Sequence, residues 1–171
     1  MSRLGRVLIG TSVVAAVAGC TAATPTVVAL DDPDTTLCLM VTEDGTAQSV
    51  ATFVQNTGTV PAVLSDFQLV NPSTKNVGFI GAYLTTPEAQ PFNGAPFSPA
   101  TSEVPLTLEP GAKKLLAYGI SLVNDPDAHT DGISFRATSG GTTTTVKSRM
   151  PVQIETTPTG CEEFGQKAGK G

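Results

Sequence analysis

Short runs of alternating apolar and polar residues, separated by turn residues, constrain the fold of this chain more than any other feature. Such period-two alternation predicts strands with one buried face, because a helix would place apolar residues three and four positions apart. Glycine, proline, asparagine and aspartate separate the runs. The predicted strands cover residues 37–41, 47–55, 62–70, 77–84, 104–109, 116–122, 133–137 and 146–154.

Two turns give the clearest local signals. Ser139-Gly140-Gly141-Thr142 predicts a two-residue hairpin, and Glu109-Pro110-Gly111 predicts a turn in which glycine accepts a positive φ. Pro151 cannot donate a ladder hydrogen bond, so the last predicted strand lies at an edge or is bulged there. The strand over 77–84 is apolar on both faces, so it is predicted to be central or covered by a loop.

Seven or eight short antiparallel strands predict one all-β domain, a two-sheet β-sandwich over residues 35–161, with a small barrel as the alternative. Leu106-x-Leu108-x-Pro110-Gly111, followed by an apolar strand, resembles the strand-turn-strand unit of bacterial immunoglobulin-like domains. The strand that ends at Asn56-Thr57-Gly58 is similar. The resemblance covers residues 47–123 and implies an immunoglobulin-like sandwich. The chain has no Trp for the central core position, which argues against the antibody type.

The N-terminal segment has the composition of an export signal. Arg3 and Arg6 precede an apolar run over residues 7–17, which is shorter than the roughly 20 residues that span a bilayer. Val17-Ala18-Gly19-Cys20 resembles the lipobox of bacterial lipoproteins, in which the cysteine thiol receives a diacylglycerol and becomes the new N-terminus. The resemblance implies a signal peptide over 1–19. It also implies a covalent lipid on Cys20, with the protein held on the extracytoplasmic face of the cell membrane. No other cofactor is expected.

The segments on either side of the domain are predicted to be flexible. Residues 20–34 are expected to form the lipidated cysteine and a tether, in which Asp31, Asp32 and Asp34 keep the chain soluble and extended. Residues 162–171 are rich in glycine and lysine and are expected to form a flexible tail.

The charge of the chain narrows the range of partners. Removal of Arg3 and Arg6 with the signal leaves eight basic against fifteen acidic residues, a formal charge of −7. An acidic surface argues against nucleic-acid partners and against electrostatic docking on anionic lipid. The lipid on Cys20 is therefore the expected link to the membrane.

Cys38 and Cys161 remain after lipidation of Cys20, and they flank almost all of the periodic region. The compartment outside the cytoplasmic membrane permits oxidation, so a Cys38–Cys161 disulfide is predicted. It would join the first predicted strand to the end of the last. Two free thiols or a metal–thiolate pair are the alternatives.

Asp125, Asp127, His129 and Asp131 alternate in a loop between two predicted strands. Alternating oxygen ligands are used by Ca²⁺ sites, and a histidine admits Zn²⁺ or Cu²⁺. The spacing is not that of an EF-hand loop, and no glutamate closes it. Aspartate, asparagine, proline and glycine are also typical of a solvated turn, so both interpretations stay open.

The loop over residues 86–102 is long for a compact sandwich and carries Phe92 and Phe97 among four prolines. Long loops without secondary structure are often functional, and two aromatic side chains on a proline-stiffened loop suit a partner contact. The same side chains could instead fold back and plug the open end of the sandwich.

No catalytic motif accompanies these features. The chain has no Gly-x-Ser-x-Gly, and its one histidine, His129, lies in a predicted turn, so enzymatic activity is not expected. The predicted function is a non-catalytic interaction module that contacts another envelope protein or a cell-wall component. The alternative is a metal-binding or metal-delivery lipoprotein that uses the Asp125–Asp131 loop.

Overall fold

The computed structural model describes residues 26–31, 35–40, 47–73, 77–88, 93–121 and 128–155. Within these residues the chain forms eleven strands and one short 3₁₀ helix, η1 (Pro99–Thr101). The strands are β1 (Val27–Ala29), β2 (Leu37–Met40), β3 (Ala47–Asn56), β4 (Ala62–Leu69), β5 (Gly78–Thr85), β6 (Leu106–Leu108), β7 (Lys113–Ser121), β8 (His129–Thr130), β9 (Ile133–Ser139), β10 (Thr142–Lys147) and β11 (Val152–Glu155).

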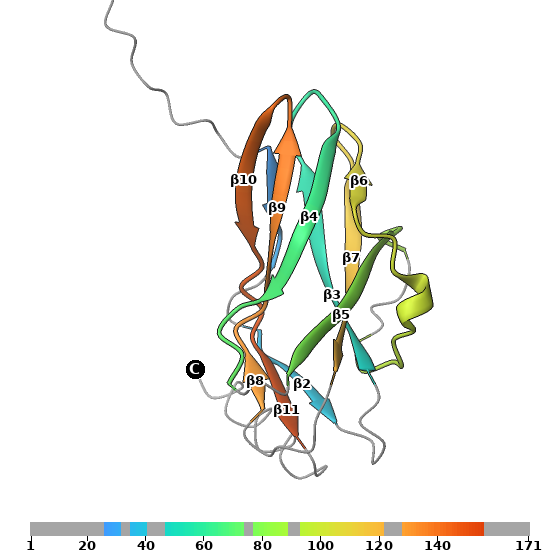
Figure 1. The fold of residues 1–171 in the computed structure, drawn as a ribbon, viewed down its shortest axis with the longest axis vertical. Coiled ribbons are helices and arrows are strands. Elements are labelled where there is room, and N and C mark those ends of the chain that lie inside the picture. Colours follow the sequence, from blue (N-terminus) through green and yellow to red (C-terminus); the bar gives the residue numbers. More distant parts are fainter. Residues whose placement is uncertain are drawn as a thin grey trace, which may run out of the picture.

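Two four-stranded sheets lie face to face (Figure 1). The first sheet has the order β1-β3-β7-β5 and the second has the order β10-β9-β4-β6. A small end sheet, β2-β11-β8, lies at one end of the sandwich, and its β2–β11 pair is parallel. The predicted all-β, immunoglobulin-like sandwich is confirmed, and the sheets do not close into a barrel.

The core lies between the inner faces of the two sheets and follows the alternation in the sequence. In β9 the burial alternates strictly, so Ile133, Phe135 and Ala137 point inward. The ring of Phe135 lies 5.4 Å from that of Phe67 in β4, centroid to centroid. Tyr118 of β7 is fully buried in the same core cluster. This packing of large apolar side chains is the main source of stability for the domain.

Three tight connections gather at the end of the sandwich that is opposite the end sheet (Figure 1). They are residues 57–61, 109–112 and 140–141, and together they are called the turn end below. Gly140 and Gly141 have φ of 56° and 81°, as the predicted hairpin requires. The predicted turn at Glu109 is also present, because the Ala112 N–H donates to the Glu109 carbonyl at 3.1 Å.

Residues 27–31 belong to the sandwich, which corrects the prediction that they form part of a flexible tether. β1 pairs antiparallel with β3, from Val27 opposite Asn56 to Ala29 opposite Val54. Three residues are too few to show an alternation, so no local pattern indicated this strand. The pairing satisfies backbone groups on the edge of β3 that would otherwise lack partners.

The last predicted strand is two strands in different sheets. β10 pairs with β9 in the second sheet, and β11 pairs with β2 and β8 in the end sheet. Pro151 lies between them, where its missing N–H interrupts the ladder, and its carbonyl accepts a hydrogen bond from Leu37 N–H at 2.9 Å. The proline therefore marks a change of sheet instead of a bulge.

β5 is an edge strand of the first sheet, so the prediction that it is central is wrong and the alternative, that a loop covers it, is confirmed. The covering segment is residues 93–102, called the strap below. It pairs with the part of β3 that β1 leaves free. The N–H groups of Ser49, Gly94 and Phe97 donate to the carbonyls of Ala95, Ser49 and Ala47 at 2.8, 3.0 and 2.7 Å.

Phe97 seats the strap on the outer face of the first sheet. Its ring is stacked on Tyr83 of β5 at 5.9 Å between centroids, and the residue is only 7% exposed. The ring lies directly over Gly119 of β7, where an added Cβ atom would overlap the ring carbons Cδ1, Cγ and Cε1. The Phe97 ring can therefore pack in this position only because residue 119 has no side chain.

We expect Gly119→Ala to destabilise the protein by roughly 1–3 kcal/mol, the usual cost of overpacking a filled site. The added methyl would overlap the Phe97 ring, which is held in place by the strap and by Tyr83. The free energy of unfolding from urea titration, followed by circular dichroism, measures this cost.

Phe97→Ala provides the control, because it removes the ring that the new methyl meets. In the Phe97→Ala background the additional cost of Gly119→Ala is expected to fall close to zero. An equal cost in both backgrounds would show that residue 119 is sensitive for another reason.

Candidate functional site

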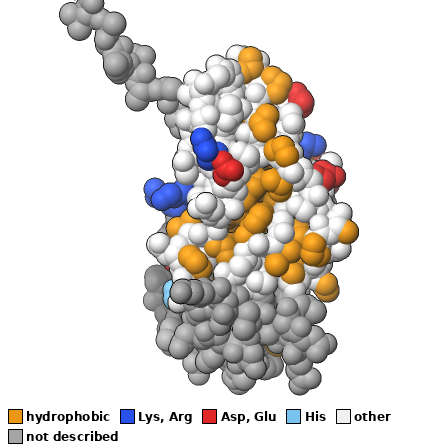
Figure 2. Space-filling model, viewed as in Figure 1, with side chains coloured by type: hydrophobic (Ala, Val, Ile, Leu, Met, Phe, Trp, Pro, Cys, Tyr) orange, Lys and Arg blue, Asp and Glu red, His pale blue; other side chains and the backbone are white. Residues whose placement is uncertain are grey.

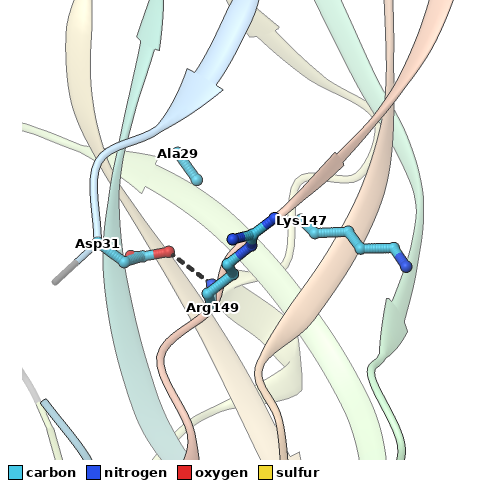
Figure 3. Close-up of a pocket in the computed structure, with 4 residues that line it drawn as sticks. All are labelled: Ala29, Asp31, Lys147 and Arg149. Atoms are coloured by element: carbon cyan, nitrogen blue, oxygen red, sulfur yellow. Dashed lines mark hydrogen bonds between the residues drawn. The ribbon is translucent and has the colours of Figure 1, made fainter. Parts of the chain in front are cut away.

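A polar pocket of about 240 Å³ lies on one side of the sandwich, between the edge strands β1 and β10 of the two sheets. It is lined by Ala29, Asp31, Lys147 and Arg149 (Figure 3). Lys147 and Arg149 are exposed, and Asp31 is half-buried. Asp31 lies two residues after the end of β1, and Arg149 lies two residues after the end of β10.

Asp31 joins the N-terminal segment to β3 and to the segment that follows β10. The hydroxyl of Thr52, a buried residue of β3, donates to Asp31 Oδ1, and the backbone N–H of Arg149 donates to Oδ2 at 3.0 Å. Figure 3 shows the Asp31 carboxylate directed at the Arg149 backbone, with the Lys147 side chain extending away from it. These two hydrogen bonds are called the Asp31 clamp below. Hydrogen bonds to a charged acceptor are among the stronger ones in proteins.

The electrostatics of the clamp are dominated by burial. Desolvation raises the pKa of Asp31, and the hydrogen bond from the Arg149 backbone N–H acts in the opposite direction. Burial, with a smaller contribution from the Asp31 charge, also raises the pKa of Tyr118. Among the described residues the Tyr118 hydroxyl has no hydrogen-bond partner. The phenol therefore stays protonated, and the carboxylate uses both oxygens to hold the chain in place.

A second hollow of about 290 Å³ adjoins Asp31 on the outer side of the first sheet. Its walls include the apolar side chains of Leu30, Phe53, Leu115 and Met150. The ammonium group of Lys113 lies 4.7 Å from the centroid of the Phe53 ring, a cation–π contact. No group that titrates, other than Asp31, is among its described lining residues.

Five of the predicted site residues lie outside the described residues: Cys20, Phe92, Asp125, Asp127 and Cys161. Cys38 lies half-buried in β2, the first of the predicted strands, from which the predicted bridge would start. Its pairing with Cys161 stays a prediction.

His129 lies in the short strand β8 and Asp131 in the turn after it, and both are exposed. Asp131 Oδ2 accepts a hydrogen bond from Asn71 Nδ2 at 2.8 Å, so one carboxylate oxygen already has a protein partner. In the described part of the chain, no three His, Cys, Asp or Glu residues come together as metal ligands would. Metal binding by the Asp125–Asp131 loop stays a prediction.

Phe97 turns its ring toward the first sheet and covers the outer face of β7 and β5. A partner that approached this face would meet exposed strap residues such as Pro96, Ser98 and Pro99, because the Phe97 ring is largely buried. A role for Phe97 as a partner contact stays a prediction.

The side of the sandwich opposite the pocket is less completely covered. β6 pairs only with Ala62–Leu64, so the rest of β4 has no strand beside it on that edge among the described residues. Across the gap, Phe79 of β5 stacks on Phe67 at 5.7 Å between centroids. Figure 2 shows hydrophobic side chains gathered along the boundary between β4 and β5 and over β5. The partly exposed apolar residues here are Leu69, Phe79, Ile80 and Leu84, called the open side below.

No family model matches the chain, and no curated protein matches it. The solved structures that match the chain include the following two. The ASH / PapD-like domain of human CEP192 (PapD-like domain 7) is 11% identical, with a TM-score of 0.38 over 90% of this chain and 98% of that one. The secreted serine protease VesC from Vibrio cholerae is 10% identical, with a TM-score of 0.31 over 74% of this chain and 24% of that one.

The architecture of the chain itself defines its class, an immunoglobulin-like β-sandwich with a half-buried carboxylate that holds the N-terminal strand. Among the described residues, no helix has the length and apolar character needed to cross a bilayer. Folds of this class carry many functions, so the function has to be argued from surfaces and attachment.

The stability of the protein relative to Asp31→Asn should increase as the pH falls. Because the pKa of Asp31 is raised above its ordinary value of 3.8, the folded state binds the proton more tightly than the unfolded state. This contribution is fully present below pH 3.8 and is lost as the pH rises through the raised pKa. Urea unfolding of both proteins over a series of pH values measures it. If the difference in the free energy of unfolding between the two proteins did not change with pH, the raised pKa of Asp31 would be contradicted.

Proposed function

We propose that this protein is a lipoprotein of the cell envelope that displays a non-catalytic, immunoglobulin-like domain on the extracytoplasmic face of the membrane and binds another envelope protein there. The covalent lipid on Cys20 is the only prosthetic group in this proposal. A Cys38–Cys161 bridge would stabilise the end sheet, because β2 carries Cys38 and pairs with β11, the last described strand before Cys161.

The anchor is supported by the sequence. The Val17-Ala18-Gly19-Cys20 motif ends a charged and then apolar segment, and the first residue with a described position in the fold is Thr26. Two or three acyl chains, at about 0.8 kcal/mol for each buried CH₂, hold a protein on a membrane far better than a single chain. A domain of this kind needs no other attachment.

The open side is the single observation that carries the interaction role. It exposes parts of Leu69, Phe79, Ile80 and Leu84 beside a strand edge that has no described neighbour, and contiguous apolar surface next to a free edge is typical of protein-binding sites. The edge strand β10 of the second sheet offers no such patch, since it presents mainly threonines and lysine. A partner with an extended apolar segment fits the open side best.

Cys20→Ala should move the protein from the membrane fraction to the soluble fraction of the compartment outside the cytoplasmic membrane. The substitution removes the thiol that would receive the lipid, and with it the label from an alkynyl fatty acid fed to the cells. Fractionation and labelling of both proteins measure the change. Retention of the label in Cys20→Ala would contradict the anchor.

A photoreactive p-benzoylphenylalanine at position 80 should crosslink the protein to one envelope partner in intact cells. Ile80 lies at a register shift of β5 and is partly exposed, so the replacement need not disturb the core. The same group at Thr145, an exposed position on the opposite edge strand β10, serves as the matched control.

The partner recovered from position 80 should be identified by mass spectrometry and tested against Ile80→Asp, which places a charge on the open side. Binding should be lost while the thermal unfolding midpoint stays close to that of the parent protein. Equal crosslinking from positions 80 and 145 would remove the open side from consideration.

A further inference from the structure

We propose that the turn end of the domain lies against the lipid surface, so that the end sheet and the open side face away from the membrane. This inference rests on the proposed lipid anchor at Cys20. The surface that the turn end contacts is the bilayer in which the lipid is inserted. The position of β1 in the fold limits how the domain can stand on that bilayer.

The chain between the anchor and the fold is short. Thr26 is six residues after Cys20, and even a fully extended chain of that length spans only about 20 Å. Thr26 is fixed at the turn end, because its carbonyl accepts hydrogen bonds from the N–H and the hydroxyl of Thr57 at 2.6 and 3.1 Å. β1 starts at the next residue.

The Asp31 clamp keeps this connection short. If β1 detached from β3, residues 26–31 would lengthen the tether to about twice its reach. Three register pairs with β3 and two hydrogen bonds to Asp31, from Thr52 and Arg149, oppose this. The clamp thus fastens the end of β1 to β3 and to the segment that follows β10, and so keeps β1 in place.

Two lengths exclude the inverted orientation. Val27 pairs with Asn56, the last residue of β3, and the ten residues of β3 extend about 30 Å from the turn end toward the end sheet. If the end sheet contacted the membrane instead, Thr26 would lie about 30 Å above the membrane surface. A tether of about 20 Å does not permit it.

The chemistry of the turn end suits a position close to lipid headgroups. Its three turns contain threonine, glycine, proline, alanine and valine, and a single charged residue, Glu109. Val60 is 42% exposed and lies beside Gly140, with its Cγ2 3.6 Å from the position of a Cβ there. An end with a single acidic residue meets little repulsion from an anionic surface.

The open side would then stand clear of the membrane. Phe79 pairs with Ile120, and Ile120 pairs with Gln48, which is eight residues from Asn56 along β3. This places Phe79 about 25 Å from the turn end. A partner could therefore reach it without entering the headgroup region.

Single tryptophans test the orientation, because the chain has none of its own. Val60→Trp labels the turn end. Met40→Trp labels the opposite end, since the Met40 carbonyl accepts a hydrogen bond from Gln48 Nε2 near the start of β3. Both parent residues are 42% exposed, so they form a matched pair.

The lipidated, full-length variants are incorporated into vesicles of phosphatidylethanolamine and phosphatidylglycerol that carry a dansyl group on some headgroups. Energy transfer to dansyl should remove most of the tryptophan emission of Val60→Trp and leave most of the emission of Met40→Trp. A long Gly/Ser insertion between Cys20 and Thr26 should make the two variants similar. Equal transfer from both variants without the insertion would overturn the proposal.

Flotation of the vesicles separates this result from failure of the anchor. If the protein does not float with the vesicles, or floats equally well as Cys20→Ala, the lipid anchor itself is wrong. If it floats only with Cys20 present and both tryptophans transfer equally, the anchor stands and the orientation is wrong.

Discussion

The pairing of β3 with β7 in the middle of the first sheet is the constraint on which the rest of the structure depends. It is continuous over nine residue pairs, from Ala47 opposite Ser121 to Gln55 opposite Lys113. One face of this ribbon carries core side chains such as Val50 and Tyr118, and the other carries Gly119, on which the strap rests. Because β7 fills one edge of β3, the other edge remains for segments distant in the sequence.

Two such segments share that edge of β3. β1 covers the half next to the turn end, and the strap covers the half next to the end sheet. Each supplies backbone partners that an exposed edge would lack, and the edge is thereby closed to pairing with other chains. The same arrangement makes the N-terminal strand part of the domain. Among the described strands, it leaves β5 and the part of β4 beyond Leu64 as the less protected side of the sandwich.

The fold class and most strands could be predicted from the sequence because period-two alternation and turn residues are local properties. The hairpin at Gly140-Gly141 and the turn at Glu109 were predictable for the same reason. β1 and β8, with three and two residues, carry no period of their own and exist only through their partners β3 and β11. The split of the last predicted strand at Pro151 was predictable only in part. The missing N–H predicts an interruption of the ladder, but the sheet that the chain joins after Pro151 depends on packing.

The site was less predictable because its contacts join distant residues. The sequence around Asp31 is that of an ordinary polar tether and gives no sign of burial. Its partners Thr52 and Arg149 lie 21 and 118 positions away. Burial of a carboxylate is costly unless hydrogen bonds compensate it, so its place between the sheets requires both partners. Only the complete fold brings both hydrogen-bond donors to Asp31, so the carboxylate can be buried only in the folded protein. The Asp31 clamp therefore makes the length of the tether, and with it the reach of the domain above a membrane, a property of the folded state.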